Sequence, residues 1–457
     1  MTTRPAYIGL VTLVLVAALS GGRAQAKDVQ VTTGDYFSCA WKKNELAKCW
    51  GLNAQGQLGL GSTAATIGNA ANQMGNNLAA INFGTGRSAA TVAAGSFHAC
   101  AQLDNGQVKC WGNNSSGELG LGNTTARGRS ATDMGDGLPA VDLGSDASGV
   151  AYTAKRISAG AAHSCALLVN NQVKCWGNNQ FGQLGQGDMN NRGDGVGLMG
   201  NNLLAVDLGT DPITLLPYGA KEIGALGYQT CARLDNDDLK CWGHNGYGQL
   251  GQGDLNHRGD VAGEMGAALA RVKLGTGRIA NKVAGGAFHL CALLNDASVK
   301  CWGRNADGQL GLGDTADRGD GPNEMANNLV ALSLGTGLAA LDIVAAGAHS
   351  CALLGNAALK CWGDNAFGQL GQGDVASRGD VALEMGDALP AIVLGSGRTA
   401  KRVATGVTHT CAVLDNQQLK CWGRNQYGQL GLGDSNDRGD AAGEMGDALP
   451  AIDLGTF

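Results

Sequence analysis

Short segments in which apolar and polar residues alternate recur along the chain, separated by turns that contain glycine or asparagine. In one copy, Cys100 to Leu103 and Gln107 to Cys110 flank Asp104-Asn105-Gly106. Alternation on both sides of an Asn-Gly turn predicts a β-hairpin, with Leu103 opposite Gln107 and Cys100 opposite Cys110. Few stretches have the apolar spacing of an amphipathic helix, so the pattern predicts an all-β protein.

This hairpin pattern occurs seven times, each time as a cysteine, nine residues and then Cys-Trp-Gly. The first cysteines of successive copies are 60 to 66 residues apart, which indicates a repeat architecture. Opposed residues on antiparallel strands lie about 4.5–5.5 Å apart at Cα, so each pair can form a disulfide. Nine intervening residues do not match a zinc site, and no metal is expected. The expected disulfides use all 14 cysteines: Cys39–Cys49, Cys100–Cys110, Cys165–Cys175, Cys231–Cys241, Cys291–Cys301, Cys351–Cys361 and Cys411–Cys421.

The last repeat indicates how many strands each unit holds. Its pattern predicts a strand at 402–404, a hairpin at 410–414 and 418–422, and a strand at 449–454 that begins next to Pro450. About four strands in each of seven units predicts a seven-bladed β-propeller, in which radial closure protects the sheet edges. The segment 28–34 resembles the first strand of a unit, so the N- and C-terminal strands are expected to share a blade.

The first residues have the features of a secretory signal peptide. Arg4 supplies the positive region, Ile8 to Leu19 the apolar run, and Ala24-Gln25-Ala26 a cleavage site. We therefore expect a signal peptide at 1–26 and a propeller at 27–457, with no membrane span after cleavage. Export places the cysteines in an oxidising compartment, which is periplasmic, extracellular or at the cell surface.

Charge and composition narrow the classes of partner. Removal of Arg4 and Arg23 with the signal peptide leaves 31 basic against 39 acidic residues. This acidic balance, without a basic tail, argues against nucleic-acid binding, which needs clustered lysine and arginine. Nucleophile elbows, phosphate loops and zinc-protease motifs are absent from the sequence, so we expect a protein that is not an enzyme and needs no cofactor. We also expect a monomer.

The run 409–414, His-Thr-Cys-Ala-Val-Leu, and the run 420–434, Lys-Cys-Trp-Gly-Arg-Asn-Gln-Tyr-Gly-Gln-Leu-Gly-Leu-Gly-Asp, resemble the repeat of the RCC1 (regulator of chromosome condensation) family. The resemblance covers the whole predicted mature chain and implies a seven-bladed propeller with shared terminal strands. The cysteine pairs look like the secreted branch of the family. An added Arg-Gly-Asp…Glu-Met-Gly segment makes the units longer than is usual for the family.

Three repeated features are interpreted as structural. The tryptophan that follows each second cysteine could form a light-sensing or stacking cluster, but one large aromatic per blade is typical of packing between blades. The histidines that stand two residues before five first cysteines could form a metal site or proton switch. Phe37 and Gln229 replace them in the other two units, so we expect each imidazole to bond a backbone group of a neighbouring turn. The tryptophans are Trp50, Trp111, Trp176, Trp242, Trp302, Trp362 and Trp422, and the histidines are His98, His163, His289, His349 and His409.

Five Arg-Gly-Asp copies, beginning with Arg192-Gly193-Asp194, occupy the same phase of the repeat. Each arginine follows another aspartate by four residues, as Arg192 follows Asp188. An arginine held between two carboxylates in a blade loop is therefore favoured over a receptor-binding motif or a calcium site.

Function is expected where the repeats differ. The turn after Trp-Gly varies strongly in sequence, and aromatic residues precede several Gly-Gln-Leu-Gly strings. Equivalent positions on successive blades would form a ring on one face, and aromatic residues mixed with arginine favour protein binding. The alternative is that these aromatics only cover the blade hairpins. The candidate binding face comprises Phe181, Tyr247, Phe367, Tyr427, His244, Arg304, Asp364 and Arg424.

The favoured function is a secreted or cell-surface scaffold that binds a protein partner. Carbohydrate binding or action on a polysaccharide is the first alternative. Guanine-nucleotide exchange on a GTPase, which the family resemblance suggests, is the second, and seven disulfides do not suit a reducing cytosol.

Overall fold

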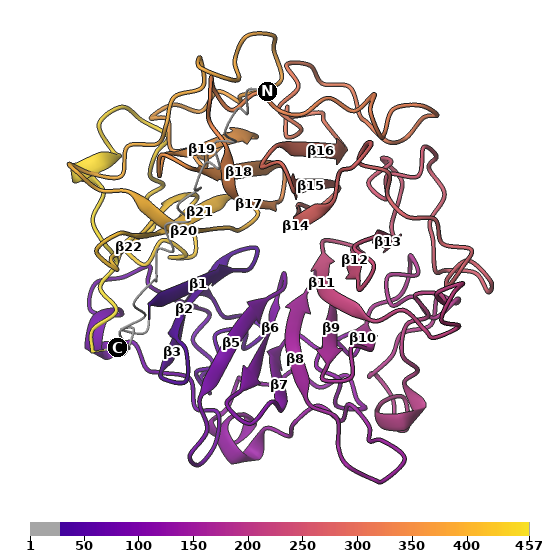
Figure 1. Ribbon diagram of the computed structural model, residues 1–457. Helices are drawn as coiled ribbons and strands as arrows, with labels where there is room; N and C mark the ends of the chain where they lie inside the picture. Colours follow the sequence, from indigo (N-terminus) through magenta and orange to yellow (C-terminus); the bar gives the residue numbers. More distant parts are fainter. Residues whose placement is uncertain (1–27, 457) are drawn as a thin grey trace, which may run out of the picture.

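The computed structural model describes residues 28–456 as seven small antiparallel sheets arranged around a central axis (Figure 1). The predicted all-β, seven-bladed propeller is therefore confirmed. Each sheet, or blade, contains an inner, a middle and a third strand that follow one another in sequence. The predicted signal peptide, residues 1–26, lies outside the described residues. Within residues 28–456 no helix is long and apolar enough to cross a membrane.

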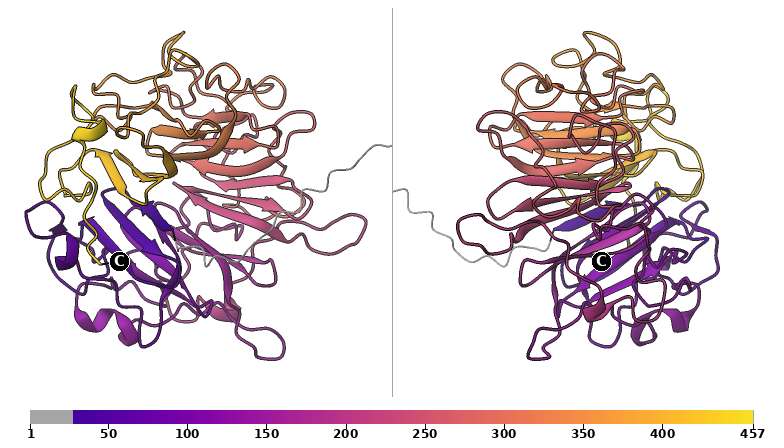
Figure 2. Two further views of the ribbon diagram at one scale, coloured as in Figure 1. Left: turned by 60° about the vertical axis from the view of Figure 1, so that its left-hand side comes forward. Right: turned by 90° about the vertical axis from the view of Figure 1, so that its right-hand side faces the viewer.

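The inner strands surround the axis, and the third strands lie farthest from it (Figures 1 and 2). The inner strands of blades 1 to 7 are β1 (Val29–Thr33), β5 (Ala89–Ala94), β8 (Ala154–Ala159), β11 (Ala220–Leu226), β14 (Ala280–Gly285), β17 (Ala340–Ala346) and β20 (Ala400–Thr405). The middle strands are β2 (Phe37–Lys42), β6 (His98–Leu103), β9 (His163–Leu168), β12 (Gln229–Leu234), β15 (His289–Leu294), β18 (His349–Leu354) and β21 (His409–Leu414). The third strands are β3 (Ala47–Leu52), β7 (Val108–Gly112), β10 (Val173–Gly177), β13 (Leu239–Gly243), β16 (Val299–Gly303), β19 (Leu359–Gly363) and β22 (Leu419–Gly423).

The remaining elements are short. Blade 1 alone has a fourth strand, β4 (Thr66–Ile67). The 3₁₀ helices are η1 (Gly75–Asn77), η2 (Ala131–Asp133), η3 (Gly135–Gly137), η4 (Gly200–Asn202) and η5 (Gly446–Ala448). We call the side of the disc on which the middle strands begin and the third strands end face A. The hairpin tips, such as Asp104–Gly106, lie at the opposite ends of these strands, on face B.

The expectation of four strands per blade is wrong for six blades, because two separate pieces cover the outer edge of each third strand. In blade 7, Arg438 forms a single bridge with Gly423 at one end of β22. At the other end, the Ile452 N–H donates to the Leu419 carbonyl over 2.8 Å. The insert between these pieces keeps them from forming one strand, so the predicted strand at 449–454 is an extended segment with one backbone bond to β22.

All seven expected disulfides are present, and none of the described cysteines is free. Each links directly opposed residues of a middle and a third strand, as the register of Cys100 and Cys110 shows. Their Cα atoms are 4.0–4.1 Å apart. Closed loops of 11 residues constrain the unfolded chain, and paired thiols throughout the protein are typical of an oxidising compartment.

Hydrogen bonds between buried side chains join neighbouring blades. The Gln429 carbonyl of blade 7 accepts from Trp50 Nε1 of blade 1 over 3.0 Å and from Ser38 Oγ over 2.9 Å. His409 Nε2 lies 2.9 Å from Ser38 Oγ. Because the serine proton goes to Gln429, the imidazole donates from Nε2 and leaves Nδ1 unprotonated. All seven tryptophans are fully buried and donate in this way to the preceding blade.

The five repeated histidines bond a serine or threonine hydroxyl of the next blade. Their interpretation as structural therefore fits the geometry, but the expected backbone partner is wrong. The partner is a hydroxyl at the start of the next middle strand, 2.8–3.0 Å from Nε2. Where Phe37 and Gln229 replace histidine, the next blade carries Ala99 and Leu290 in place of the hydroxyl.

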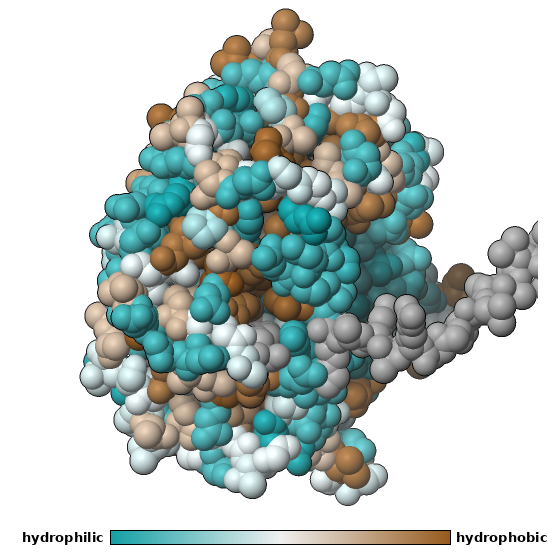
Figure 3. All heavy atoms as spheres, turned by 90° about the vertical axis from the view of Figure 1, so that its left-hand side faces the viewer, coloured by the Kyte–Doolittle hydropathy of each residue, from teal (hydrophilic) through white to brown (hydrophobic). Residues whose placement is uncertain are grey.

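The chain ends meet at blade 1, but the expectation that they share a blade is wrong. β1 pairs with β2 in a sheet built only from residues 29–67. The C-terminal segment completes the edge of blade 7 and touches blade 1 through Asp453, whose carbonyl accepts from the Gly75 N–H over 2.9 Å. Blades 1 to 7 are each built from one unit of the chain. The ring therefore closes between blades 7 and 1 through the same contacts that join the other six pairs of neighbouring blades. On this side of the molecule hydrophilic and hydrophobic residues are interspersed (Figure 3).

Candidate binding face

A cavity of about 480 Å³ opens on the axis at face A. Every blade contributes the end of its inner strand and the turn that follows, and the lining consists mainly of glycine, alanine, serine, threonine and valine. Asp35 is the one acidic residue in this lining, and the lining contains no basic residue. Burial raises the pKa of Asp35 to about 6, and a hydrogen bond from the Ser96 side chain opposes the rise.

Three of the four predicted aromatic residues contact an aromatic ring of the next blade, and two of these partner rings, Tyr228 and Phe288, line the cavity. The ring centroids of Phe181 and Tyr228 are 5.8 Å apart, and those of Tyr247 and Phe288 are 5.2 Å apart. Tyr427 similarly approaches Tyr36 with a centroid distance of 5.3 Å. In each case a residue of one blade meets a residue of the next blade. The predicted aromatics therefore do line one face, and they also cover the joints between blades.

The rim consists of two aromatic clusters rather than a continuous ring. The first spans blades 3 to 5, and the second spans blades 6, 7, 1 and 2. The first cluster contains Phe181, Tyr228, His244, Tyr247, His257, Phe288 and Arg304. The second contains Phe367, Arg424, Tyr427, Tyr36 and Phe97.

The two predicted arginines lie against aromatic rings. The Arg424 guanidinium carbon is 4.5 Å from the Phe367 centroid and 5.8 Å from that of Tyr36. The Arg304 guanidinium carbon is 5.7 Å from the centroid of Tyr247. Such cation–π contacts hold the guanidinium groups at the rim, where Arg424 Nη2 donates to Gln426 Oε1 and Arg304 Nη2 lies 3.9 Å from Asp307 Oδ2.

The other two predicted residues are tied into their own turns. Asp364 accepts from Gln369 Nε2 over 2.7 Å. His244 is hydrogen-bonded to Gln249, and its ring packs against Phe181 with a centroid distance of 4.6 Å. Burial, followed by the neighbouring His257, lowers the pKa of His244 to about 4. His244 is therefore a neutral part of the rim at pH 7.

Sequence reasoning missed Tyr36, Phe97, Tyr228, Phe288 and His257. The first four stand immediately before a middle strand, next to the repeated histidine position. Because side chains alternate across a strand, an aromatic beside a buried residue at a strand end points away from the core. That position was the available signal.

One sector of the rim is acidic. Asp307 of blade 5 occupies the position that an aromatic residue takes in four other blades. Burial raises its pKa, nearby Arg304 lowers it, and Asp364 and Asp380 of blade 6 raise it further. Within residues 28–456 no group of three or more histidine, cysteine, aspartate or glutamate residues could hold a metal ion. The geometry thus offers an apolar cavity, aromatic walls, two arginines and an acidic sector.

A family model described as RCC1-like domain matches residues 16–382, and RCC1-repeat models match residues 361–413 and 400–429. The chain belongs to the RCC1-like family. It is 32% identical over 286 residues to the ultraviolet-B receptor UVR8 of Arabidopsis thaliana, covering 62% of this chain and 56% of the relative. It is 27% identical over 390 residues to the human E3 ubiquitin-protein ligase HERC2, covering 84% of this chain and 7% of the relative.

Solved RCC1-like structures share the fold. Human WBSCR16 superposes with a TM-score of 0.61 at 18% identity, covering 89% of this chain and 92% of that chain. Prp20p of Saccharomyces cerevisiae, described with its binding to Gsp1p and histones, gives a TM-score of 0.59 at 20% identity, covering 84% of this chain and 82% of that chain. The chain spans about half of UVR8 and a small part of HERC2.

In this RCC1-like propeller the Arg-Gly-Asp copies belong to the blade loops. Arg192 Nη2 donates to Asp188 Oδ2 over 2.7 Å, and Nη1 donates to two backbone carbonyls. The expected clamp therefore has one carboxylate rather than two, because the second side of the guanidinium faces backbone. In four copies the last aspartate has a buried Oδ1, at Asp260, Asp320, Asp380 and Asp440. An arginine bonded in this way is not displayed as a receptor ligand would be.

Proposed function

We propose that the chain is an exported, non-enzymatic RCC1-like propeller that binds a protein partner through face A. In this proposal residues 1–26 direct export, and residues 27–457 form the mature propeller of the secreted, disulfide-containing branch. It acts as a monomer in the periplasm, outside the cell or at the cell surface. Support comes from the seven disulfides, which suit an oxidising compartment.

The observation that carries the binding function is the rim of aromatic and arginine side chains around the face A cavity. Tyrosine and arginine are enriched at protein-interaction hot spots. The cavity differs from blade to blade in its side chains, although the backbone repeats. An asymmetric partner surface can therefore bind in one orientation.

The charges indicate the chemistry of the partner. Asp35 lies inside the cavity, and Asp307, Asp364 and Asp380 lie together on the rim of blades 5 and 6. We infer a protruding loop that places an apolar residue in the cavity and a basic residue toward these carboxylates. Opposite charges across an interface favour encounter and fix the orientation of binding.

The experiment is affinity capture by the immobilised mature protein from its native envelope or medium, followed by quantitative mass spectrometry. A partner that binds face A is lost with Tyr247→Ala/Tyr427→Ala, weakened by Asp35→Asn and retained by Val169→Ala. Val169 is a matched apolar control, because it is 49% exposed and lies at a hairpin tip on face B. Capture that Tyr247→Ala/Tyr427→Ala leaves unchanged would exclude face A as the docking surface.

The alternatives have less support. Tyr247 packs against Phe288 with its ring tilted by 51° and carries Arg304 near its face, which restricts stacking by a sugar. Glycan-array binding that depends on Tyr247 and Tyr427 would nevertheless replace the protein-binding proposal. Nucleotide exchange is not proposed, because likeness to Prp20p at 20% identity extends to the fold alone.

A further inference from the structure

Each blade contains a buried lysine in the sequence Lys-Cys-Trp-Gly, on the third strand. Its Nζ atom donates to two backbone carbonyls on face B, over 2.7–3.1 Å. One carbonyl comes from the segment that ends the preceding unit, and the other comes from the loop of the lysine's own unit. The seven lysines are Lys48, Lys109, Lys174, Lys240, Lys300, Lys360 and Lys420, each at most 8% exposed.

Burial lowers the pKa of each of these lysines, and at six interfaces a nearby aspartate opposes that shift. The aspartate occupies one of two positions. In blades 2, 6 and 7 the aspartate lies on the loop of the lysine's own unit, and it is Asp136, Asp387 and Asp447 respectively. In blades 3, 4 and 1 it lies on the segment that ends the preceding unit, and it is Asp142, Asp207 and Asp453 respectively.

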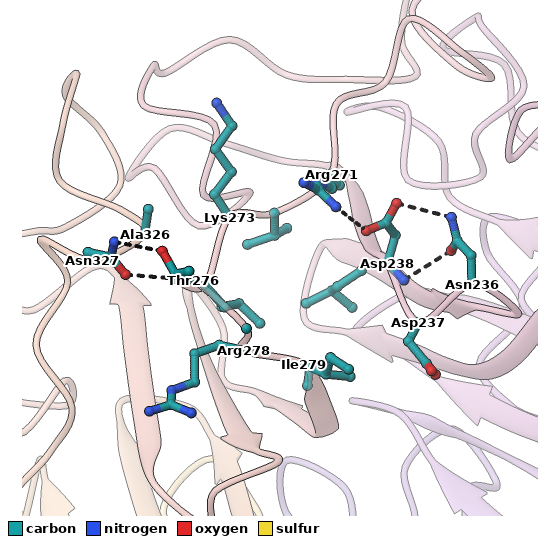
Figure 4. A pocket seen from close by; sticks show the side chains of 16 residues that line it. Asn236, Asp237, Asp238, Arg271, Lys273, Thr276, Arg278, Ile279, Ala326 and Asn327 are labelled. Carbon is teal, nitrogen blue, oxygen red and sulfur yellow. Dashed lines mark hydrogen bonds and ion pairs between the residues drawn. The ribbon is translucent and has the colours of Figure 1, made fainter. Parts of the chain in front are cut away.

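The interface between blades 4 and 5 lacks this acid at both positions. The loop position holds Asn327, which bonds Thr276 through its side chain as Asp387 bonds Thr336 (Figure 4). The segment position holds Lys273, so a second cation replaces a carboxylate. For Lys300, nearby Arg278 lowers the pKa further, and only the weaker influence of Asp296 opposes it.

A pocket of about 550 Å³ lies at this interface, lined by Lys273, Thr276, Arg278, Asn327 and the hairpin tip Asn236–Asp238. Arg271 is paired with Asp238 over 2.8 Å, and Arg278 with Asp296 over 2.8 Å. Figure 4 shows the Lys273 side chain extending away from Asp237 and Asp238. The Lys273 carbonyl accepts from the Ala326 N–H over 2.9 Å, but the Lys273 side chain has no hydrogen-bond or ion-pair partner among residues 28–456. The pocket therefore has unbalanced positive charge beside a buried ammonium group.

We propose that this face B pocket binds an anionic ligand through a carboxylate group, which takes the place of the missing aspartate. Lys273 provides the unpaired positive charge, and the Asn327 and Thr276 side chains provide polar contacts at the rim. A carboxylate is the expected class, since six equivalent interfaces place a carboxylate beside the lysine. The site lies at the opposite ends of the strands from face A, so it is independent of the function proposed above.

The test is calorimetric titration of the mature protein with citrate, and separately with inorganic phosphate, at pH 7 and constant ionic strength. We expect one saturable citrate site, which Lys273→Asp weakens by about tenfold or more. Circular dichroism should show that Lys273→Asp folds, because the substitution restores the charge pattern of the other interfaces. Absence of saturable citrate binding, or equal binding by Lys273→Asp, would overturn the proposal.

A transplant provides a second test that does not depend on loss of function. Ser333→Lys/Asp387→Asn gives the interface of blades 5 and 6 the counterparts of Lys273 and Asn327, and should raise the stoichiometry from one site to two. Val393→Lys is the matched control, since it adds a lysine at the equivalent position but keeps Asp447, and should add no site. A second site in the control, or phosphate binding tighter than citrate, would contradict a carboxylate site defined by the missing acid.

Discussion

Acidification should destabilise the propeller steeply below pH 6.5, because five buried histidines cannot accept a proton while it is folded. Each is 0% exposed and donates from Nε2 to a hydroxyl, and its Nδ1 has no partner among the described residues. Burial lowers the pKa of His98 to about 4 and those of the other four, His163, His289, His349 and His409, to about 3.

The sign follows from the depressed pKa values in the folded state. Unfolded histidine titrates near pH 6.5, so between pH 6.5 and about 4 the unfolded chain binds more protons than the folded one, and stability falls as pH falls. Each proton changes the free energy of unfolding by about 1.4 kcal/mol per pH unit. Five histidines nearly saturated in the unfolded chain therefore remove about 6 kcal/mol between pH 6 and pH 5.

Asp35 acts in the opposite direction. Its pKa is raised to about 6, so the folded protein binds the extra proton as pH falls from 6 toward 4. This offsets about 1 kcal/mol over the same interval. The five histidines and Asp35 together give an expected loss of about 5 kcal/mol, and His244, with its pKa lowered to about 4, acts in the same direction as the other histidines. This loss is large beside the typical stability of 5–15 kcal/mol for a domain.

Urea unfolding at pH 7, 6 and 5, with the disulfides intact, measures this dependence. Glutamine is a suitable replacement, because Gln229 already occupies the histidine position in blade 4. The change in unfolding free energy between pH 6 and pH 5 should shrink by about 1 kcal/mol in His289→Gln and by about 4 kcal/mol in His98→Gln/His289→Gln/His409→Gln. An equal pH dependence in the wild type and the triple variant would refute the assignment of the loss to these imidazoles.

Two further substitutions test the ring closure and the disulfide. Ser38→Ala leaves the His409 N–H without its acceptor at the interface of blades 7 and 1. It should lower the free energy of unfolding in urea by about 1–3 kcal/mol. Ser435→Ala, at an exposed serine, is the control and should change this free energy little. Cys411→Ser/Cys421→Ser removes an 11-residue loop closure and should cost about 2–3 kcal/mol, and denatured, unreduced wild-type protein should titrate with no free thiol.

The blade hairpins could be predicted from the sequence because every determinant is local. Alternation, the Asn-Gly turn and the cysteine spacing all specify the same register around Cys100 and Cys110. The outer edge could not be predicted in the same way, since its two pieces are separated by the Arg-Gly-Asp insert. The alternation of apolar and polar residues at 449–454 fits a strand, but it fits equally well an extended segment that makes one backbone hydrogen bond to β22.

For the candidate site, the sequence identified side chains but not their partners. Phe181 and Tyr247 were expected as members of a ring, and their contacts with Tyr228 and Phe288 depend on how adjacent blades are rotated. That rotation is a tertiary property. The sequence did hold some of this information as paired substitutions, because Phe37 is matched by Ala99 in the next blade and Gln229 by Leu290.

The same comparison between repeats distinguishes two kinds of departure from the repeat pattern, the loss of a histidine and the loss of an aspartate. Where a histidine is lost, its hydroxyl partner is lost with it, so neither an imidazole N–H nor a hydroxyl is left without its repeat partner, although the buried Oε1 of Gln229 has no hydrogen-bond partner among the described residues. At the interface of blades 4 and 5 the aspartate is lost but Lys300 is retained, and Lys273 adds charge of the same sign. An uncompensated change costs stability at a buried ammonium group. A bound carboxylate would remove that cost, whereas the histidine exceptions need no ligand, and this difference singles out the pocket beside Lys300.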